Sequence, residues 1–184
     1  MGLGLPKDLW PYFKQNLNAQ QHDVAMRHAI SAGTVWPNFH WLQLVVQANA
    51  ETPLAGILNL RLELPLSPTR SRMYSWFAVD KRSSAEYRKL AYETYVRTFG
   101  PSGIFDQDDM ENWEDCTVTA KGPAAKRHTL HHKMGLHRPR ASDWPGPGIA
   151  YADSYGEMTH RAWYAEWLRW MKKPLNGSNK GIRA

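Results

Sequence analysis

The chain has 184 residues, of which 42% are hydrophobic and nine are tryptophan, so we expect one folded domain with a substantial core and not a disordered chain. Its single cysteine, Cys116, excludes an internal disulfide framework and any site built from several thiolates of this chain, a complete iron–sulfur centre included. The formal net charge of +6 is spread from Lys7 to Arg183 instead of forming a block, which argues against a nucleic-acid partner.

No apolar run approaches the eighteen or so residues of a membrane-spanning helix, and the first ten residues lack the charged region and apolar core of a secretory signal. We therefore expect a cytoplasmic protein without a membrane partner. Pro6 and Pro11 predict an irregular opening, and residues 16–31 are polar with moderate helical periodicity.

Two strands are predicted next. Residues 34–47 are rich in aromatic and β-branched side chains, and Pro37 within them lacks a ladder N–H, which places it at a strand start, an edge or a bulge. Residues 58–64 alternate strictly between leucine and polar side chains, which predicts a strand with the leucine face buried and the polar face wet. With a third strand at 73–79, these elements predict an antiparallel meander.

A helix should follow, because Ser83 and Glu86 have the spacing of a capping box and apolar residues recur at helical spacing to about Arg97. Gly and Pro at 100–103 end it. A last helix, with Ser154 and Glu157 at its start, is predicted to reach about residue 172. We expect one domain over residues 1–174 and a disordered tail at 175–184.

The most unusual stretch is acidic, although the chain as a whole is basic. Six acids fall within ten residues, and no Lys or Arg lies between Arg97 and Lys121: Asp106, Asp108, Asp109, Glu111, Glu114 and Asp115. One interpretation is the solvated start of a helix, where acids suit the positive end of the macrodipole. The other is that one carboxylate points inward as a ligand for a hard or borderline cation. The first half of residues 106–120 is predicted helical, and the second half fits helix or strand.

Two known metal patterns fit this sequence poorly. An EF-hand loop needs Gly at its sixth position and Glu at its twelfth, which counted from Asp106 hold Glu111 and Thr117. His128 and His132 would share one face of a predicted strand at 125–134, but flanking Lys and Arg would repel a cation, so we interpret these histidines as strand surface.

Residues 97–113, RTFGPSGIFDQDDMENW, resemble the catalytic-domain signature of ring-hydroxylating dioxygenase α subunits, the Rieske non-haem iron oxygenases. The resemblance includes GTVWPN at 33–38 and spans roughly residues 20–172. It implies an α+β fold in which a curved antiparallel sheet packs on helices, in the helix-grip manner, here as an incomplete catalytic domain.

The resemblance also implies site residues. Ferrous iron in this family is held by two imidazoles and one carboxylate, and the carboxylate is the second Asp of the doublet, here Asp109. Glu111 and Asn112 match the polar residues after the doublet and would orient that carboxylate. Aromatic substrate-pocket walls correspond to Phe99 and Phe105, with further wall positions at Ile30, Ala32 and Leu42; for all five, ordinary core packing is the alternative.

The sequence departs from the family in lacking both the Asp-x-x-His-x4-His iron motif and the Cys/His pairs of the Rieske cluster. We therefore expect the C-terminal part of an α subunit, as a truncated frame, a fragment or one half of a split protein. Its Fe(II) site would be incomplete, the [2Fe-2S] cluster would belong to a missing N-terminal part, and we assign no catalytic residue to this chain.

The function that follows is that of a segment of an aromatic-ring dioxygenase, an oxidoreductase of aromatic hydrocarbon catabolism that forms a cis-dihydrodiol, inactive on its own. Its implied partners are an aromatic substrate, an N-terminal α-subunit half, a β subunit and electron-transfer proteins. One alternative is a non-enzymatic domain that binds apolar or aromatic ligands. Another is a remnant that exposes apolar surface and folds poorly.

Overall fold

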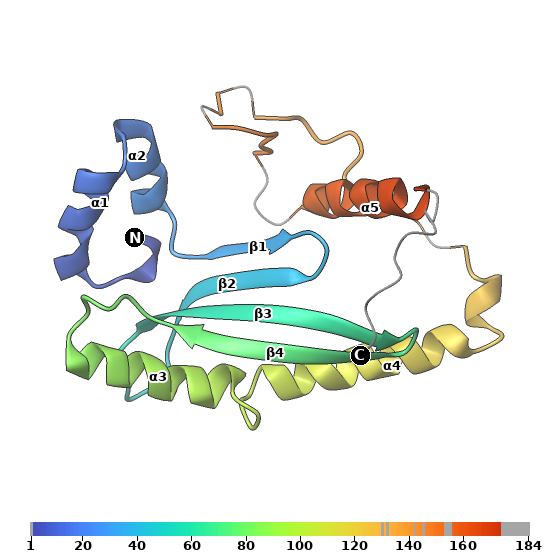
Figure 1. Cartoon of the computed structure of the whole chain (residues 1–184), viewed down its shortest axis with the longest axis horizontal. Helices are drawn as coiled ribbons and strands as arrows, with labels where there is room; N and C mark the ends of the chain where they lie inside the picture. The colour runs from blue at the N-terminus through green and yellow to red at the C-terminus, as the bar shows by residue number, and fades with distance from the viewer. Residues whose placement is uncertain are drawn as a thin grey trace, which may run out of the picture. The chain divides into compact units, whose positions relative to one another are not determined.

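Four antiparallel strands form the framework of the chain, in the order β1-β2-β3-β4 (Figure 1). The computed structural model describes residues 2–129, 131, 133–141, 143–144, 146–152 and 156–173. These group into two compact units, residues 1–129 and 130–184. The α+β architecture with an antiparallel sheet agrees with the expected fold class. None of the helices in the described ranges has the length and apolarity that crossing a membrane requires.

The first unit begins with helices, contrary to the irregular opening that its prolines predict. Two 3₁₀ turns, η1 (Gly2–Gly4) and η2 (Lys7–Leu9), lead into α1 (Trp10–Asn16), in which Pro11 occupies the first turn. Proline is tolerated there because its missing N–H has no partner inside the helix anyway. The predicted helix that follows is α2 (Ala19–Arg27), whose N-cap Asn18 and residue Gln21 form a capping box.

The predicted strand at 34–47 is in fact two strands. β1 (Ser31–Val35) and β2 (Phe39–Val46) form a hairpin, and the turn between them contains Pro37, which follows a cis peptide bond. Pro37 therefore lies outside both ladders, not at the start, edge or bulge of one strand. The turn is tied to the neighbouring strand by Asn38, whose side chain donates to the carbonyl oxygen of Glu63 at 2.6 Å.

β3 (Ala55–Ser67) and β4 (Arg70–Ala78) complete the meander. β3 extends beyond the predicted 58–64 at both ends, and β4 begins three residues before the predicted 73–79. The expectation that the polar face of β3 is wet is wrong. Asn59 is fully buried, whereas Leu58, Leu60 and Leu62 on the other face are only half-buried. The helix that follows packs on the face of Asn59, because Ala55 and Ile57 at the beginning of β3 make that face apolar too.

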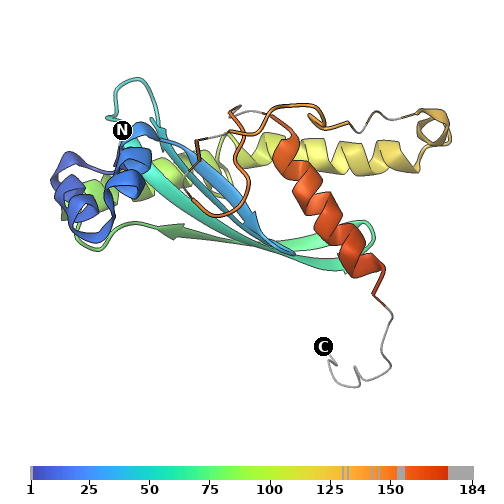
Figure 2. The same ribbon diagram turned by 90° about the horizontal axis from the view of Figure 1, so that it is seen from above.

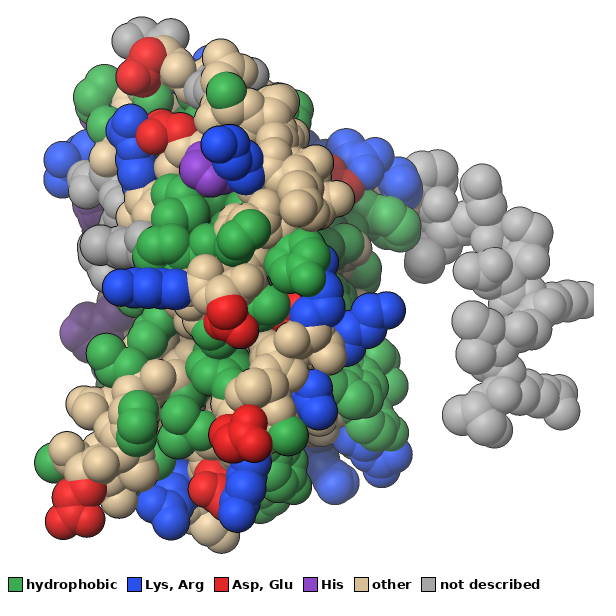
Figure 3. Space-filling view, turned by 90° about the vertical axis from the view of Figure 1, so that its left-hand side faces the viewer, with side chains coloured by type: hydrophobic (Ala, Val, Ile, Leu, Met, Phe, Trp, Pro, Cys, Tyr) green, Lys and Arg blue, Asp and Glu red, His purple; other side chains and the backbone are tan. Residues whose placement is uncertain are grey.

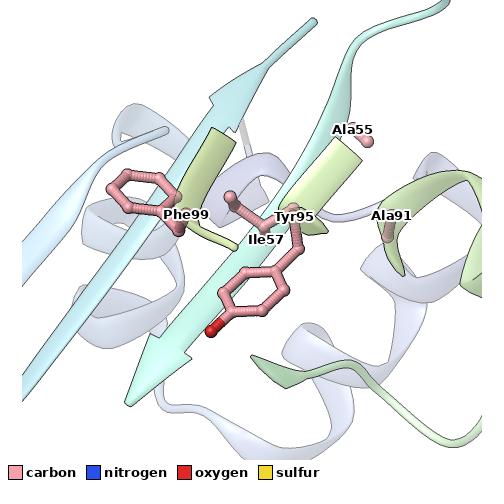
Figure 4. Close-up of a cluster of buried hydrophobic side chains, with 5 residues drawn as sticks. All are labelled: Ala55, Ile57, Ala91, Tyr95 and Phe99. Atoms are coloured by element: carbon pink, nitrogen blue, oxygen red, sulfur yellow. The ribbon is translucent and has the colours of Figure 1, made fainter. Parts of the chain in front are cut away.

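That helix is α3 (Ala85–Phe99), and it forms the core with β3. Figure 4 shows this cluster, in which β3 and α3 contribute Ala55, Ile57, Ala91, Tyr95 and Phe99. Half-buried side chains from β2 and β4, such as Leu42 and Phe77, pack around it. Burial of one such large side chain stabilises the fold by about 1.5–3 kcal/mol.

The start of α3 differs from the predicted capping box by one residue. The N-cap is Ser84, whose side-chain oxygen accepts from the backbone N–H of Tyr87 at 3.1 Å. Ser83 is buried, and its hydroxyl has no hydrogen-bond partner among the described residues. The error arises because both serines precede the same apolar periodicity, and Glu86 therefore falls at the second helical position instead of the third.

After the break at 100–105, α4 (Asp106–Lys121) is helical throughout, which decides the open question about its second half. α3 and α4 follow one another along one side of the sheet (Figure 2). A 3₁₀ turn, η3 (Ala125–Arg127), replaces the beginning of the strand predicted at 125–134, and none of the described residues in that range is in a strand. His132 lies outside the described residues.

The second unit contains the last predicted helix, α5 (Met158–Met171). An isolated antiparallel bridge joins Arg140 to Tyr151. Ser154, the predicted cap of this helix, and the predicted tail at 175–184 lie outside the described residues.

Candidate functional site

A groove lies in the first unit between the β3–β4 hairpin and helices α3 and α4. Its volume is about 1060 Å³. Figure 2 shows α4 diverging from the hairpin on this side of the molecule. Apolar and aromatic side chains form most of the groove wall: Met73, Tyr92, Tyr95, Val96, Phe99, Pro101, Met110 and Trp113. Such a lining suits an apolar aromatic molecule.

Each element presents these side chains through its own periodicity. On β4, Ser71, Met73 and Ser75 alternate onto the face that α3 covers. On α4, Asp106 is followed four residues later by Met110 and seven residues later by Trp113, so all three lie along one helical face. One face of β4 and one face of α4 therefore line the groove.

Ring contacts hold the α3 wall of the groove together. The Phe77 ring lies 5.2 Å from that of Tyr95 and 5.8 Å from that of Tyr92, measured between centroids. Phe99 and Phe105 are 5.3 Å apart. Burial raises the pKa of the Tyr95 hydroxyl above its ordinary value, so this group stays neutral at physiological pH.

A buried ion pair includes Asp106, which forms part of the groove wall. Arg61 on β3 donates to the carboxylate of Asp106, and their side chains are only 13% and 6% exposed. The guanidinium carbon of Arg61 also lies 5.5 Å from the centre of the Phe99 ring. Burial raises the pKa of Asp106, and the hydrogen bond and charge of Arg61 offset part of that rise.

Asp109, the predicted iron ligand, lies one turn along α4 from Asp106. Its side chain is exposed and does not line the groove. Glu111 is also exposed, and the side-chain amide of Asn112 donates to the backbone carbonyl of Asp108 at 2.8 Å. Asn112 thus bonds to its own helix, and the roles of these three residues towards a metal stay predictions.

The five predicted pocket residues form two groups. Phe99 lines the groove, and Phe105, 38% exposed, packs against its ring. Leu42 is half-buried against the core, and Ala32 pairs with it across the hairpin. Ile30 precedes β1 and is 54% exposed. The structure thus brings the two phenylalanines together and sets the other three residues at the β1–β2 side of the sheet.

The described residues do not make a metal site by themselves. No group of three or more His, Cys, Asp or Glu in the described ranges is close enough to hold a metal ion. Asp109 could supply the carboxylate of the two-imidazole, one-carboxylate iron site that the sequence signature implies, but no cluster among the described residues completes that site. Any such site needs two further ligands from outside the described residues.

Sequence reasoning missed the groove residues on β4 and the partnership of Arg61 with Asp106. One signal was available: Arg61 is a long charged side chain at a polar position in the middle of the leucine alternation of β3, on the face that α3 covers. The charged side chains on the surface of the described residues do not mark a further site. On the face that Figure 3 shows, Lys and Arg side chains are interspersed with Asp and Glu and with hydrophobic side chains.

The comparisons with known proteins agree with the sequence signature. No protein-family model matches the chain. The α subunit of N,N-dimethyl phenylurea N-demethylase from Sphingobium sp. strain YBL2 is 28% identical over 94% of this chain. The biphenyl dioxygenase α subunit from Metapseudomonas furukawaii is 32% identical over 66% of it. The chain spans 40% of the length of the first relative and 26% of the second.

A solved structure is also similar along almost the whole chain. The crystal structure of naphthalene 1,2-dioxygenase from Rhodococcus sp., bound to indole, matches 94% of this chain with a TM-score of 0.85 and 32% sequence identity. The match covers 40% of that longer chain. Sequence and fold therefore point to the same group of proteins.

Proposed function

Because the chain belongs to the ring-hydroxylating dioxygenase α subunits and covers a segment of their catalytic domain, we propose that it supplies one iron ligand and part of the substrate wall to such an enzyme. The observation that carries the proposal is the match over 94% of the chain to naphthalene 1,2-dioxygenase. The reaction would insert both atoms of dioxygen into an aromatic ring to give a cis-dihydrodiol.

The proposed iron ligand is the carboxylate of Asp109. Its position one turn inside α4 suits this role, because the helix holds the backbone of Asp109 rigidly, with its N–H bonded to the carbonyl oxygen of Phe105 at 3.1 Å. The two imidazoles, and the [2Fe-2S] cluster that delivers electrons in this family, would come from outside the described residues. Glu111 and Asn112 are proposed to orient Asp109 in the assembled site.

Phe99 and Phe105 are proposed as substrate walls, with Ile30, Ala32 and Leu42 as further wall positions on the sheet. The paired rings of Phe99 and Phe105 present a rigid apolar surface, which favours an aromatic substrate over a charged one. The proposed partners are an N-terminal α-subunit part, a β subunit and electron-transfer proteins, in the cytoplasm. A binding domain without catalysis is not favoured, because the relatives named above are enzyme subunits.

The test is an Asp109→Ala substitution in the assembled enzyme, meaning this chain together with the part of an α subunit that carries the histidines. We expect iron content, measured by mass spectrometry, to fall from about one atom per α subunit to background, and dihydrodiol formation to stop. Asp108→Ala is the matched control, since Asp108 is an equally exposed acid on the same turn of α4. Equal iron content in both variants would refute the role of Asp109.

A further inference from the structure

Helix α4 is attached to the sheet through its first residue. Of the sixteen residues of α4, Asp106 is the one buried side chain, Thr117 is half-buried, and the others are exposed. Met110 and Trp113 line the groove and are 46% and 49% exposed, so about half of each side chain is buried and neither is enclosed. Most helices gain their stability and orientation from a buried apolar face, and within the described residues α4 has no fully buried apolar side chain.

The segment before α4 is well held. The N–H groups of Ile104 and Phe105 donate to the carbonyl oxygens of Arg97 and Thr98 at 3.1 and 3.0 Å, and the Phe105 ring packs on Phe99. These contacts place the chain as far as Phe105. They leave the direction of the helix after Phe105 to whichever side chain on α4 next contacts the sheet.

That side chain is Asp106, and its partner is well suited to fix a direction. Arg61 extends from β3, an inner strand that pairs with β2 and β4 on its two sides, and its guanidinium is confined against the Phe99 ring. A planar guanidinium bonds a carboxylate with defined geometry, unlike the diffuse attraction of an ammonium group. In a buried site this pair contributes orientation more than net stability, because desolvation offsets the attraction.

We propose that Arg61 and Asp106 are positioning residues, whose ion pair sets the direction of α4 relative to the sheet and thereby the location of Asp109. The consequence for Asp109 rests on the function proposed above. The direction of α4 is a property of this chain alone and is measurable without iron, so the two ideas fail separately.

Cys116 makes the measurement direct, because it is the single cysteine of the chain, lies on α4 and is exposed. A spin label there and a second at Thr69→Cys, in the exposed β3–β4 turn, report the distance between α4 and the sheet by double electron–electron resonance. We expect one narrow distance distribution in the parent chain. We expect a broad or displaced one in Arg61→Met and in Asp106→Asn.

The decisive variant replaces both partners, as Arg61→Met with Asp106→Leu. An apolar pair of similar size leaves no unpaired charge, so this variant should fold with a melting temperature at or above that of the parent. It lacks the directional contact, and we therefore expect its distance distribution to broaden all the same. Arg61→Lys, which keeps a charge partner for Asp106, should restore a distribution narrower than that of Arg61→Met.

Two controls separate position from stability. Ile57→Val removes a methyl group from the core and should lower the melting temperature without broadening the distribution. Arg27→Met removes an exposed ion pair with Asp23 on α2 and should change neither the melting temperature nor the distance distribution. An unchanged narrow distribution in the double variant would overturn the proposal, whatever Asp109→Ala does to iron.

In the assembled enzyme, the double variant should lower iron occupancy severalfold without abolishing it, since Asp109 is present but misplaced. If α4 moves in the resonance experiment while Asp109→Ala leaves iron unchanged, the positioning of α4 stands and the proposed function of Asp109 fails.

Discussion

At the scale of single residues, two aspartates of this chain show how burial decides the behaviour of an ion pair. Asp80 accepts hydrogen bonds from the side chain and the backbone of Arg82 near the surface, and these lower its pKa to about 2. Asp106 also bonds an arginine, yet burial raises its pKa above the ordinary 3.8. The same pairing of an aspartate with an arginine is therefore accompanied by pKa shifts of opposite sign, because only Asp106 is strongly desolvated.

The two aspartates should be distinguishable by carboxyl carbon NMR during an acid titration. We expect Asp80 to titrate at about pH 2 and Asp106 above 3.8. In Arg61→Met the pKa of Asp106 should rise further, because the partner that favours the ionised carboxylate is gone. A midpoint for Asp106 at or below 3.8 in the parent chain would contradict the dominance of burial.

The same shifts have consequences for stability, with opposite signs. Folded Asp106 binds its proton more tightly than the unfolded chain does, so its contribution to the free energy of unfolding decreases as the pH rises from 3.8 through its raised pKa. The contribution of Asp80 is present above 3.8 and is lost as the pH falls towards 2. Denaturant unfolding across this pH range measures both trends. Asp106→Asn should lose the first trend and keep the second, and Asp80→Asn should do the reverse.

At the scale of elements, the beginning of α3 illustrates a boundary that pattern alone misplaced. Ser83 and Ser84 are both good N-cap residues, and they are adjacent. The hydroxyl of Ser84 bonds the backbone N–H of Tyr87, whereas the backbone N–H of Ser83 donates to the carbonyl oxygen of Asp80 in the preceding turn. The turn that leads out of β4 therefore decides which serine caps the helix.

This pair offers a matched test of the cap. Ser84→Ala should lower the free energy of unfolding by about 1 kcal/mol, because one N–H of the first helical turn loses its partner. Ser83→Ala should leave it unchanged or raise it slightly, because the buried Ser83 hydroxyl has no partner among the described residues and costs desolvation. Thermal or denaturant unfolding measures both. A larger loss from Ser83→Ala would place the cap one residue earlier.

At the scale of the whole molecule, the iron site proposed above is one that this chain shares with residues beyond those described. The match covers 40% of the naphthalene 1,2-dioxygenase chain, and the described residues contain no group of three or more His, Cys, Asp or Glu that could hold a metal ion. The exposure of Asp109 is consistent with a ligand that meets its partners only on assembly.

We therefore expect the purified chain not to form a dihydrodiol when supplied with an aromatic substrate and a reductant. Its affinity for Fe(II), followed by anaerobic titration, should be weak and should change little in Asp109→Ala, because one exposed carboxylate competes poorly with water for the ion. A stoichiometric, Asp109-dependent iron site in the isolated chain would show that the missing ligands lie within it.

Much of this protein could be predicted from its sequence. The signature at 97–113 identified the family, and the leucine alternation of β3, the apolar spacing of α3 and the acidic start of α4 located three of the elements that build the groove. These features are local, because each depends on side chains a few residues apart. Phe99 and Phe105, by contrast, were assigned through the family resemblance, and the structure shows that their rings are in contact.

Only the tertiary structure decided which surfaces meet. Alternation shows that β3 has two different faces but not which one a helix will cover, and the buried face proved to be that of Asn59 and Arg61. A row of acids likewise does not reveal which carboxylate is buried, and it is Asp106 instead of Asp109. Burial depends on partners that are 45 residues away in the chain, as Arg61 is from Asp106, and no local pattern records that distance.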